Sequence, residues 1–299
     1  MKTNRFTYKI TFTLINVLCS HLVFCISSGT NKSPADTNKI FLYDTLVNKK
    51  RTVYKLKPVV DIPIVAVCGG WSGYLLLTQI YSKGPSTQQQ IMSLDINSIN
   101  PIDRMAVYPY NASLDKNSYY PFYAAFPLPL VFFLTGNNMR SDFPKLAFLY
   151  LETLSVTGLF GTSATNFVNQ YRPYAYTSST SIEQKVSQNS KNSFYAGHVE
   201  IIATSTFFLS EVYSSYYPES KIKWLFFVLS GAATAGMGYA RITAGMHFPS
   251  DVLLGAGVGA SSGILVPYFH NHKIIKNSDL SFAPYGDDNT YGLSVVYKF

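Results

Sequence analysis

The chain has 299 residues, of which 47% are hydrophobic, 15% aromatic and only 13% charged. This length and hydrophobic content suffice for one large domain with a sizeable core, and the low charge favours a membrane-associated or deeply buried bundle over a soluble cytosolic enzyme. The mean hydropathy of +0.09 is nevertheless low for a protein made mostly of membrane spans. The net charge of +8 favours anionic surfaces or phosphorylated ligands, but no patch of interleaved basic and aromatic residues indicates nucleic acid.

Residues 1–28 have the pattern of a secretory signal peptide. Three cations precede an apolar stretch at 10–26, and Ser27-Ser28 supplies small residues for cleavage. An uncleaved membrane anchor is the alternative. Cleavage would remove those three cations and no acid, leaving a net charge of +5 and Cys68 as the single cysteine of the mature chain. A single cysteine excludes an intramolecular disulfide, and we expect Cys68 to fill the core rather than to act as a nucleophile.

Residues 29–60 are predicted to form a polar lead-in with a basic cluster at 48–57. For residues 61–272 the pattern predicts an all-α domain, a six-helix bundle. Each apolar segment is long enough for a helix that is buried on all sides or spans a bilayer, and these segments cover residues 62–81, 121–136, 145–168, 197–217, 222–240 and 251–269. The polar stretches between them, 82–120 and 171–196, are the loops in which we expect polar chemistry.

The end of the chain carries a packing pattern and a strand pattern. Three glycines recur at four-residue spacing in the last apolar segment: Gly255, Gly259 and Gly263. Such a stripe predicts the close approach of another helix. Residues 273–299 then form a polar tail, in which the turn signal GDDN at 286–289 precedes the alternating stretch LSVVYKF at 293–299. This pattern predicts a short β-hairpin.

The segment 240–255 carries the clearest chemical pattern. Arg241 precedes His247 by six positions, Asp251 follows it by four, and Pro249 stands where the first turn of a helix tolerates proline. An aspartate one turn beyond a histidine can accept the hydrogen bond from one imidazole nitrogen and leave the other nitrogen as a nucleophile. The planar fork of Arg241 would bind two oxygens of a phosphate that the imidazole attacks in line.

Two further pieces flank the polar stretch 171–196. His198 follows Ala196-Gly197 at the start of an apolar helix, where backbone N–H groups favour an anion. Its imidazole could protonate a leaving oxygen as a general acid. Arg172, which precedes Pro173 at the end of the third apolar segment, is by itself most simply interpreted as a lone loop arginine.

The two remaining histidines of the predicted mature chain lie close together after the last helix. His270 and His272 flank Asn271 where the chain turns polar. We expect them to be a solvated surface pair rather than ligands of a metal ion. The sequence predicts no metal site and no cofactor.

Taken together, these pieces resemble the type-2 phosphatidic acid phosphatase superfamily, which shares its helical core with vanadium haloperoxidases. The resemblance covers about residues 60–269 and is most specific over 165–255. That family's signature is a Lys and an Arg-Pro separated by six residues, then Pro-Ser-Gly-His, then Ser-Arg, five residues, His, three residues and Asp. The resemblance implies that His247 is a nucleophile forming a phosphohistidine, that Asp251 orients it and that His198 is the general acid. The positions implied to hold the phosphate are Arg172, Arg241, Ala196 and Gly197.

The chain departs from this signature at four positions: Thr165 for Lys, Tyr195 for Pro, Ala196 for Ser and Ala240 for Ser. One phosphate-binding cation and one hydroxyl are therefore missing. A hydrogen bond to a charged group is worth roughly 1.5–3 kcal/mol, so either loss could slow turnover by about one to two orders of magnitude. Lys185 or Lys191, in the polar loop, is a candidate to restore the charge.

The resemblance implies a phosphatase of the bacterial cell envelope that hydrolyses a phosphomonoester or pyrophosphate, which we expect on a membrane lipid. A degenerate member that binds phosphorylated lipid without turnover is the alternative favoured by the departures, and a haloperoxidase is a more distant one.

Family members usually face outward, so the site is expected on the periplasmic side. A cleaved leader followed by three crossings before Arg172 would instead place the site in the cytoplasm, unless 121–136 does not cross. The basic cluster at 48–57 favours a cytoplasmic lead-in.

Overall fold

The structure is a computed structural model and describes residues 53–79, 83–134, 136–272, 280–287 and 290–297. The predicted signal peptide, residues 1–28, and the lead-in up to residue 52 lie outside the described residues. Up to His272 the described chain folds into helices and the turns that connect them. The expected all-α class is therefore confirmed for the domain that carries the motifs.

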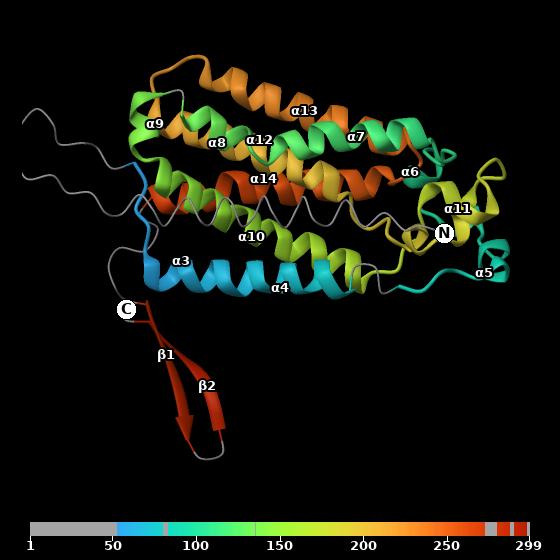
Figure 1. The fold of residues 1–299 in the computed structure, drawn as a ribbon, viewed down its shortest axis with the longest axis horizontal. Coiled ribbons are helices and arrows are strands. Elements are labelled where there is room, and N and C mark those ends of the chain that lie inside the picture. Colours follow the sequence, from blue (N-terminus) through green and yellow to red (C-terminus); the bar gives the residue numbers. More distant parts are fainter. Residues whose placement is uncertain (1–52, 80–82, 135, 273–279, 288–289, 298–299) are drawn as a thin grey trace, which may run out of the picture. The chain divides into compact units, whose positions relative to one another are not determined.

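Long helices run side by side along the domain, and short helices connect them at its two ends (Figure 1). The long helices after the first are α7 (Ala112–Ala125) with α8 (Leu128–Phe133), α10 (Phe143–Phe167), α12 (Gly197–Tyr216), α13 (Lys223–Thr243) and α14 (Pro249–Asn271). The first begins as α3 (Pro58–Ile64) and continues through a π-helical turn (Val65–Gly69), α4 (Gly70–Tyr74) and a second such turn (Leu75–Gln79). The short helices are α5 (Gln88–Met92), α6 (Pro101–Arg104), α9 (Asn137–Ser141) and α11 (Ile182–Val186), with 3₁₀ turns at Ile96–Ser98, Pro173–Tyr176 and Gln188–Lys191.

The second long element differs most from the prediction. It begins at Ala112 rather than at residue 121, because Asn111 caps the helix by accepting a hydrogen bond from the backbone N–H of Leu114 at 3.1 Å. The polar residues that follow the cap are compatible with a helix, although they were interpreted as a loop. The helix ends at Ala125, and α8 begins at Leu128, directly after Pro127. This shift brings a polar helical face into the domain.

The glycine stripe of α14 packs directly against the backbone of α12. A Cβ atom built on each glycine would lie too close to a carbonyl oxygen of α12: 2.7 Å from Ala196 for Gly255, 2.3 Å from Glu200 for Gly259 and 2.6 Å from Thr204 for Gly263. The acceptors repeat at the same four-residue spacing as the glycines. The predicted close approach of a second helix is therefore confirmed, and it fixes the start of α14 beside the start of α12.

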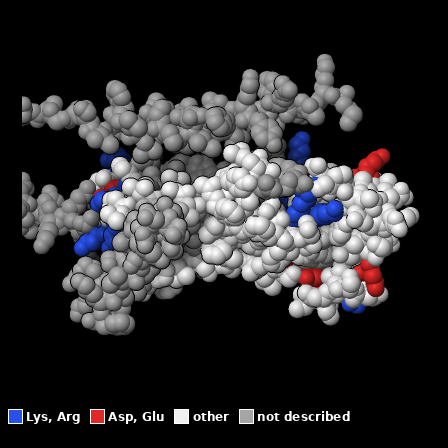
Figure 2. Space-filling model, turned by 90° about the horizontal axis from the view of Figure 1, so that it is seen from below, with Lys and Arg blue, Asp and Glu red and all other residues white. Residues whose placement is uncertain are grey.

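Three helical stretches are long and apolar enough to cross a membrane: Pro58–Thr78, Lys223–Thr243 and Pro249–Asn271. Large apolar side chains project from them into the surroundings, among them Val59, Val67, Val228 and Leu253. Figure 2 shows charged side chains gathered toward the two ends of one face of the domain, with an uncharged surface between them. An exposed apolar belt of this kind is characteristic of membrane association.

Beyond the helical domain the backbone forms two strands, β1 (Leu280–Asp287) and β2 (Thr290–Tyr297). They pair antiparallel, with register running from Leu280 opposite Tyr297 to Asp287 opposite Thr290. The second strand begins three residues earlier than the alternating stretch alone indicates, because the pairing extends to the residues directly beside the turn.

Candidate active site

The segments that carry the predicted site residues meet at one end of the domain. Helices α10 and α13 end there, and α12 and α14 begin there (Figure 1). Gly245 follows α13 in a left-handed conformation with φ of +71°, and a Cβ built on it would lie 2.6 Å from the carbonyl oxygens of Tyr108 and Pro109. Only glycine meets both constraints. The chain therefore turns sharply between Arg241, in the last turn of α13, and His247.

Arg172 lies against His247. Its Nη1 is 3.2 Å from Nε2 of His247 and donates to the carbonyl oxygen of Met246 at 2.7 Å. Its Nε and Nη2 donate to the main-chain and side-chain oxygens of Asn189, both at 2.9 Å. The guanidinium is only 6% exposed. Arg172 is therefore a buried and positioned site residue, and the interpretation as a lone loop arginine was wrong.

The orientation of His247 is set by a backbone group rather than by Asp251. Nδ1 of His247 lies 2.6 Å from the carbonyl oxygen of Ser193. Oδ2 of Asp251 instead accepts hydrogen bonds from Oγ of Ser193 at 2.6 Å and from the backbone N–H of Phe248 at 3.0 Å. The expected direct contact between Asp251 and His247 was wrong, because Asp251 turns back to cap its own helix. Asp251 reaches the imidazole only through Ser193.

His247 is held as a neutral imidazole. Burial, followed by the charges of Arg172 and Arg241, holds its pKa well below the usual value of 6.5. The Ser193 carbonyl can only accept a hydrogen bond, so Nδ1 carries the proton and Nε2 carries the lone pair. A neutral imidazole with a lone pair on Nε2 has the electronic state that a nucleophile requires.

His198 lies in the first turn of α12 between two aromatic rings of α7. The ring centroid of Phe122 is 4.3 Å and that of Tyr119 is 4.6 Å from the imidazole centroid. Burial, then the charges of Arg241 and Arg172, lower the pKa of His198 to about 2. Its Nε2 is buried and has no hydrogen-bond partner among the described residues. A buried nitrogen of this kind is expected to meet a partner when a ligand is bound.

Arg241 is also buried, and an acid from α7 faces it. Its Nη1 donates to Oδ1 of Asp115 at 2.6 Å and to Oγ of Ser118 at 2.7 Å. Its Nε is buried without a hydrogen-bond partner in the described part of the chain. Arg241 therefore retains its Nε donor for an anion, while a carboxylate already neutralises part of its charge.

One face of α7 covers the site. Its contacts with Arg241 and His198 come from residues spaced as i, i+3, i+4 and i+7: Asp115, Ser118, Tyr119 and Phe122. Residues at this spacing share one side of a helix. The sequence prediction missed Asp115, Ser118 and Tyr119 because it placed residues 112–120 in a loop. The signal was the Asn111 cap followed by this stripe.

The two positions expected to offer backbone N–H groups to a phosphate behave differently. The N–H of Ala196 donates to the carbonyl oxygen of Asp251 at 3.3 Å, so phosphate binding by this N–H stays a prediction that requires the hydrogen bond to be exchanged. Gly197 begins α12, and the N–H groups of a first helical turn have no partner within the helix. A Cβ built on Gly197 would meet no described atom within 4 Å. Room for an oxygen atom therefore remains at the start of α12.

A lysine outside the predicted set lies near the position of the missing cation. Thr165 is in the last turn of α10, three residues before Val168. The ammonium of Lys83 donates to the carbonyl oxygens of Val168 at 2.7 Å and of Lys191 at 3.4 Å. Burial, then the charges of Arg172 and Lys191, lower the pKa of Lys83 to about 8. Lys83 therefore lies close enough to Arg172 for the two charges to interact.

Lys185 and Lys191 were the two candidates to restore this charge, and the structure gives each of them a different position or partner. Lys185 is in α11, and the ammonium of Lys191 donates to the carbonyl oxygen of Gly84 at 3.3 Å. Lys191 nevertheless contributes its charge to the surroundings of Lys83. Lys83 carries no motif that would identify it from the sequence.

The histidine pair after α14 also differs from the prediction. Nε2 of His270 lies 3.4 Å from Oδ1 of Asp61 and 3.3 Å from Oε2 of Glu152, and its side chain is 12% exposed. His270 is therefore a partly buried member of a charged cluster, and the interpretation as a solvated residue was wrong for it. His272 is exposed and stacks on Tyr268.

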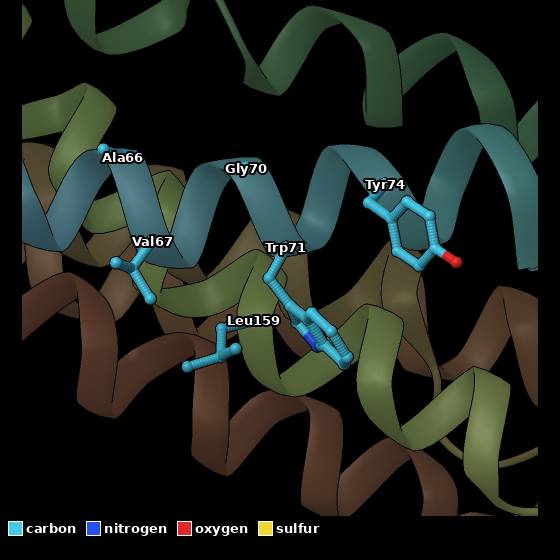
Figure 3. A pocket seen from close by; sticks show the side chains of 6 residues that line it. All are labelled: Ala66, Val67, Gly70, Trp71, Tyr74 and Leu159. Carbon is cyan, nitrogen blue, oxygen red and sulfur yellow. The ribbon is translucent and has the colours of Figure 1, made fainter. Parts of the chain in front are cut away.

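A shallow apolar groove lies along the outside of the first long helix (Figure 3). It has a volume of about 590 Å³ and is lined by Ala66, Val67, Gly70, Trp71, Tyr74 and Leu159. The indole Nε1 of Trp71 donates to Oγ of Ser163 at 3.0 Å. No predicted site residue lines this groove, so it is separate from the polar cluster.

Comparison with known proteins agrees with the geometry. Residues 146–275, which contain all the predicted catalytic residues, match the family model of the PAP2 superfamily. This segment of the chain is similar to the PAP2 superfamily. Among solved structures, the crystal structure of Aquifex aeolicus LpxE is similar to this chain at 24% sequence identity, covering 58% of this chain and 98% of that chain, with a TM-score of 0.38. No curated protein matches the chain.

Proposed function

We propose that the protein hydrolyses a phosphomonoester or pyrophosphate of a membrane lipid through a phosphohistidine on His247. One observation carries the proposal: two buried nitrogens, Nε2 of His198 and Nε of Arg241, have no hydrogen-bond partner among the described residues, in a site that also holds Arg172. Unsatisfied buried donors and two guanidinium groups together favour an oxyanion as the ligand.

The first chemical step forms the bond between nitrogen and phosphorus. The lone pair of His247 Nε2 attacks phosphorus in line while the ester bond to the leaving oxygen breaks, and the electron pair stays on that oxygen. Arg172 would turn from Nε2 to the phosphate oxygens, and Arg241 would bind them through its free Nε. Fixed cations at the developing charge lower the barrier without reorganisation.

His198 is proposed to protonate the leaving oxygen. Without a ligand its pKa of about 2 keeps it neutral, because burial and the two arginines disfavour a third positive charge. A bound phosphate offsets the arginine charges, so the pKa rises and His198 takes up one proton from the solvent when the substrate binds; that proton is released again when the phosphate leaves. Water then attacks the phosphohistidine, gives a proton to His198 and restores the lone pair of His247. The cycle therefore closes without a change in the number of protons on the protein.

The lipid character of the substrate is supported by the apolar surroundings of the site. The domain carries helices long and apolar enough to cross a membrane. Arg241 lies in the last turn of one of them, and His247 lies just before the start of another. Figure 3 shows Trp71 and Leu159 beside an apolar groove that would accept a hydrocarbon chain. A substrate with an apolar tail and a phosphorylated head group matches both features.

The test is the release of inorganic phosphate by the purified full-length chain in detergent. The panel contains phosphatidate, phosphatidylglycerophosphate, undecaprenyl pyrophosphate and lipid A. We expect release from at least one of them, complete loss in His247→Ala, and wild-type release in His272→Ala, a matched control at an exposed histidine. A radiolabelled substrate should leave acid-labile, base-stable label on the wild-type chain only. Phosphate release by His247→Ala at the wild-type rate would refute the mechanism.

A second function, binding of phosphorylated lipid without turnover, is favoured by the pairing of Asp115 with Arg241. In that arrangement the carboxylate of Asp115 accepts a hydrogen bond from Nη1 of Arg241, the arginine that the resemblance implies binds phosphate. If the pair only holds the empty site together, Asp115→Asn should lower KM several-fold, because Arg241 becomes available to the anion, whereas Ser118→Ala should change little. Tight phosphate binding by the wild type, without release from any substrate of the panel, would select the second function.

A further inference from the structure

At the end of the domain opposite the candidate active site, three helices bring together two carboxylates and an imidazole. Asp61 belongs to the first turn of α3, Glu152 to α10 and His270 to the last turn of α14. Asp61 is 3% and Glu152 is 2% exposed. One ligand atom from each side chain lies within 4.8 Å of the others. None of these residues takes part in the proposed phosphatase chemistry.

The imidazole presents its free nitrogen to the carboxylates. Nδ1 of His270 lies 2.8 Å from the carbonyl oxygen of Val266, and a carbonyl can only accept, so Nδ1 carries a proton. Metal-binding histidines are commonly fixed in this way, with the second nitrogen turned toward the ion. Nε2 of His270 faces Oδ1 of Asp61 and Oε2 of Glu152.

The distances fit shared coordination better than direct hydrogen bonds. Nε2 of His270 is 3.4 Å from Oδ1 of Asp61 and 3.3 Å from Oε2 of Glu152, whereas a charge-assisted N–H···O bond measures about 2.7–2.9 Å. Two ligands bound tetrahedrally at roughly 2.0–2.1 Å are separated by about 3.3 Å. Oε2 of Glu152 is also buried without a hydrogen-bond partner among the described residues.

The charge of the cluster also favours a bound cation. Two buried carboxylates with a neutral imidazole carry two negative charges, and protonating His270 leaves one of them uncompensated. A divalent cation balances both carboxylates and leaves the imidazole neutral, which avoids an unpaired buried charge. One histidine nitrogen and two carboxylate oxygens form a ligand set that suits Zn²⁺ and related transition metals.

We propose that Asp61, Glu152 and His270 form a binding site for a divalent transition metal ion that ties α3 and α10 to the end of α14. The fourth position of a tetrahedral site is open to water. Because the site lies at the opposite end of the domain from His247, it stabilises the fold and takes no part in the phosphoryl transfer step. The inference is independent of the proposed function.

The experiment measures metal binding by the full-length protein, purified in detergent without a polyhistidine tag and stripped with EDTA. Zn²⁺ is added at chelator-buffered concentrations, and bound zinc is counted by mass spectrometry. We expect one equivalent of zinc in the wild type and in His272→Ala, an exposed histidine two residues away. Glu152→Gln, which keeps the shape but removes a charged ligand, and His270→Ala should each weaken zinc binding at least tenfold.

Two further readouts separate a built site from nonspecific binding. Co²⁺ should give the intense visible absorption of a tetrahedral ion in the wild type, and Glu152→Gln should lose it. Saturating zinc should raise Tm by several degrees in the wild type and leave Glu152→Gln unchanged. Absence of stoichiometric binding by the wild type would overturn the proposal and leave His270 as a protonated bridge between the carboxylates. Equal binding by all four proteins would also overturn it.

Discussion

Ser193 connects two residues that the family signature relates directly. Its hydroxyl donates to Asp251 at 2.6 Å, and its carbonyl oxygen lies 2.6 Å from Nδ1 of His247. We propose that Asp251 orients the imidazole by holding the Ser193 backbone in place. A hydrogen bond to an ionised acceptor is among the stronger ones in proteins, so the support of the proposed nucleophile would depend on a residue outside the motif.

The first prediction follows from this relay. Ser193→Ala removes the hydroxyl but keeps the carbonyl, so the imidazole loses its support without losing its own hydrogen bond. We expect kcat to fall by roughly 10–100-fold, as for one lost hydrogen bond to a charged group, and Asp251→Asn to cause a similar fall. Because both act on one contact, the double variant should be no slower than the slower single variant.

The matched control is Ser190→Ala. The Ser190 side chain is fully buried, and its hydroxyl has no hydrogen-bond partner in the described part of the chain. Its loss should leave kcat unchanged. If Ser193→Ala behaves like Ser190→Ala while Asp251→Asn remains slow, Asp251 acts on His247 by another path and the relay is wrong.

The second prediction concerns the pH dependence of substrate binding. Burial, with Arg172 and Lys191 nearby, lowers the pKa of Lys83 to about 8. Lys83 is therefore charged below pH 8 and becomes neutral as the pH rises through that value. If it supplies the cation missing at Thr165, KM should increase between about pH 7 and 9.

Lys83→Met tests this assignment because it removes the charge and keeps most of the side chain. The variant should have the higher KM already at pH 7, with a flat profile up to pH 9, while kcat stays close to the wild type. Lys185→Met, in α11, is the control and should retain the wild-type profile. A wild-type KM that does not change with pH, measured from initial rates, argues against a role for Lys83.

Among the secondary structure elements, α7 and α14 show what a sequence pattern can and cannot predict. The glycine stripe of α14 predicted a close helix contact because spacing alone places those residues on one face. The long apolar segments also predicted helices close to the observed ones. The start of α7 was missed, since polar residues were taken as a loop and the capping role of Asn111 was overlooked. Helix boundaries depend on caps more than on hydrophobic runs.

The same contrast holds for the candidate site. Arg172, His198, Arg241 and His247 were predicted because they follow a motif with fixed spacing. Asp115 and Lys83 come from segments that precede the matched range 146–275, and only tertiary packing brings them to the site. The partner of Asp251 was also unpredictable, because a spacing of four residues permits either a contact with His247 or a helix cap.

The third prediction concerns the contact between α12 and α14. A Cβ on Gly259 would lie 2.3 Å from the carbonyl oxygen of Glu200, whereas a Cβ on Gly257 would meet no described atom within 4 Å. Gly259→Ala should therefore destabilise the fold by about 1–3 kcal/mol through overpacking. Gly257→Ala, in the same helix, should be neutral or stabilising by roughly 0.5–1 kcal/mol. Thermal unfolding in detergent compares them, and equal Tm values would refute the close contact.

At the scale of the whole molecule, the number of long helices before the site relates the side of the membrane on which the site lies to the cleavage of the leader. The long helices before Arg172 run along the domain three times, as α3 with α4, as α7 with α8, and as α10 (Figure 1). The start of α3 therefore lies at the end opposite the site. If all three cross the membrane, a periplasmic site requires a cytoplasmic lead-in. A leader cleaved in the periplasm instead leaves the lead-in in the periplasm, and three crossings then place the site in the cytoplasm.

The fourth prediction decides between these two orientations. The basic cluster at 48–57 directly precedes α3, and cations close to a span favour the cytoplasm. We therefore expect the site end to face the periplasm and the leader to remain uncleaved. In a cysteine-free background, Ser179→Cys marks the site end and Glu219→Cys, in the turn between α12 and α13, marks the other end; both positions are exposed.

A membrane-impermeant maleimide added to intact cells whose outer membrane has been permeabilised should label Ser179→Cys and spare Glu219→Cys. After lysis both should react, which controls for intrinsic reactivity. The mass of the purified chain should then include residues 1–28. The opposite labelling pattern, together with a mature chain that begins near Gly29, would place His247 on the cytoplasmic side. The substrate would then have to present its phosphate to that leaflet, because the phosphate-binding groups lie at one end of the helices only.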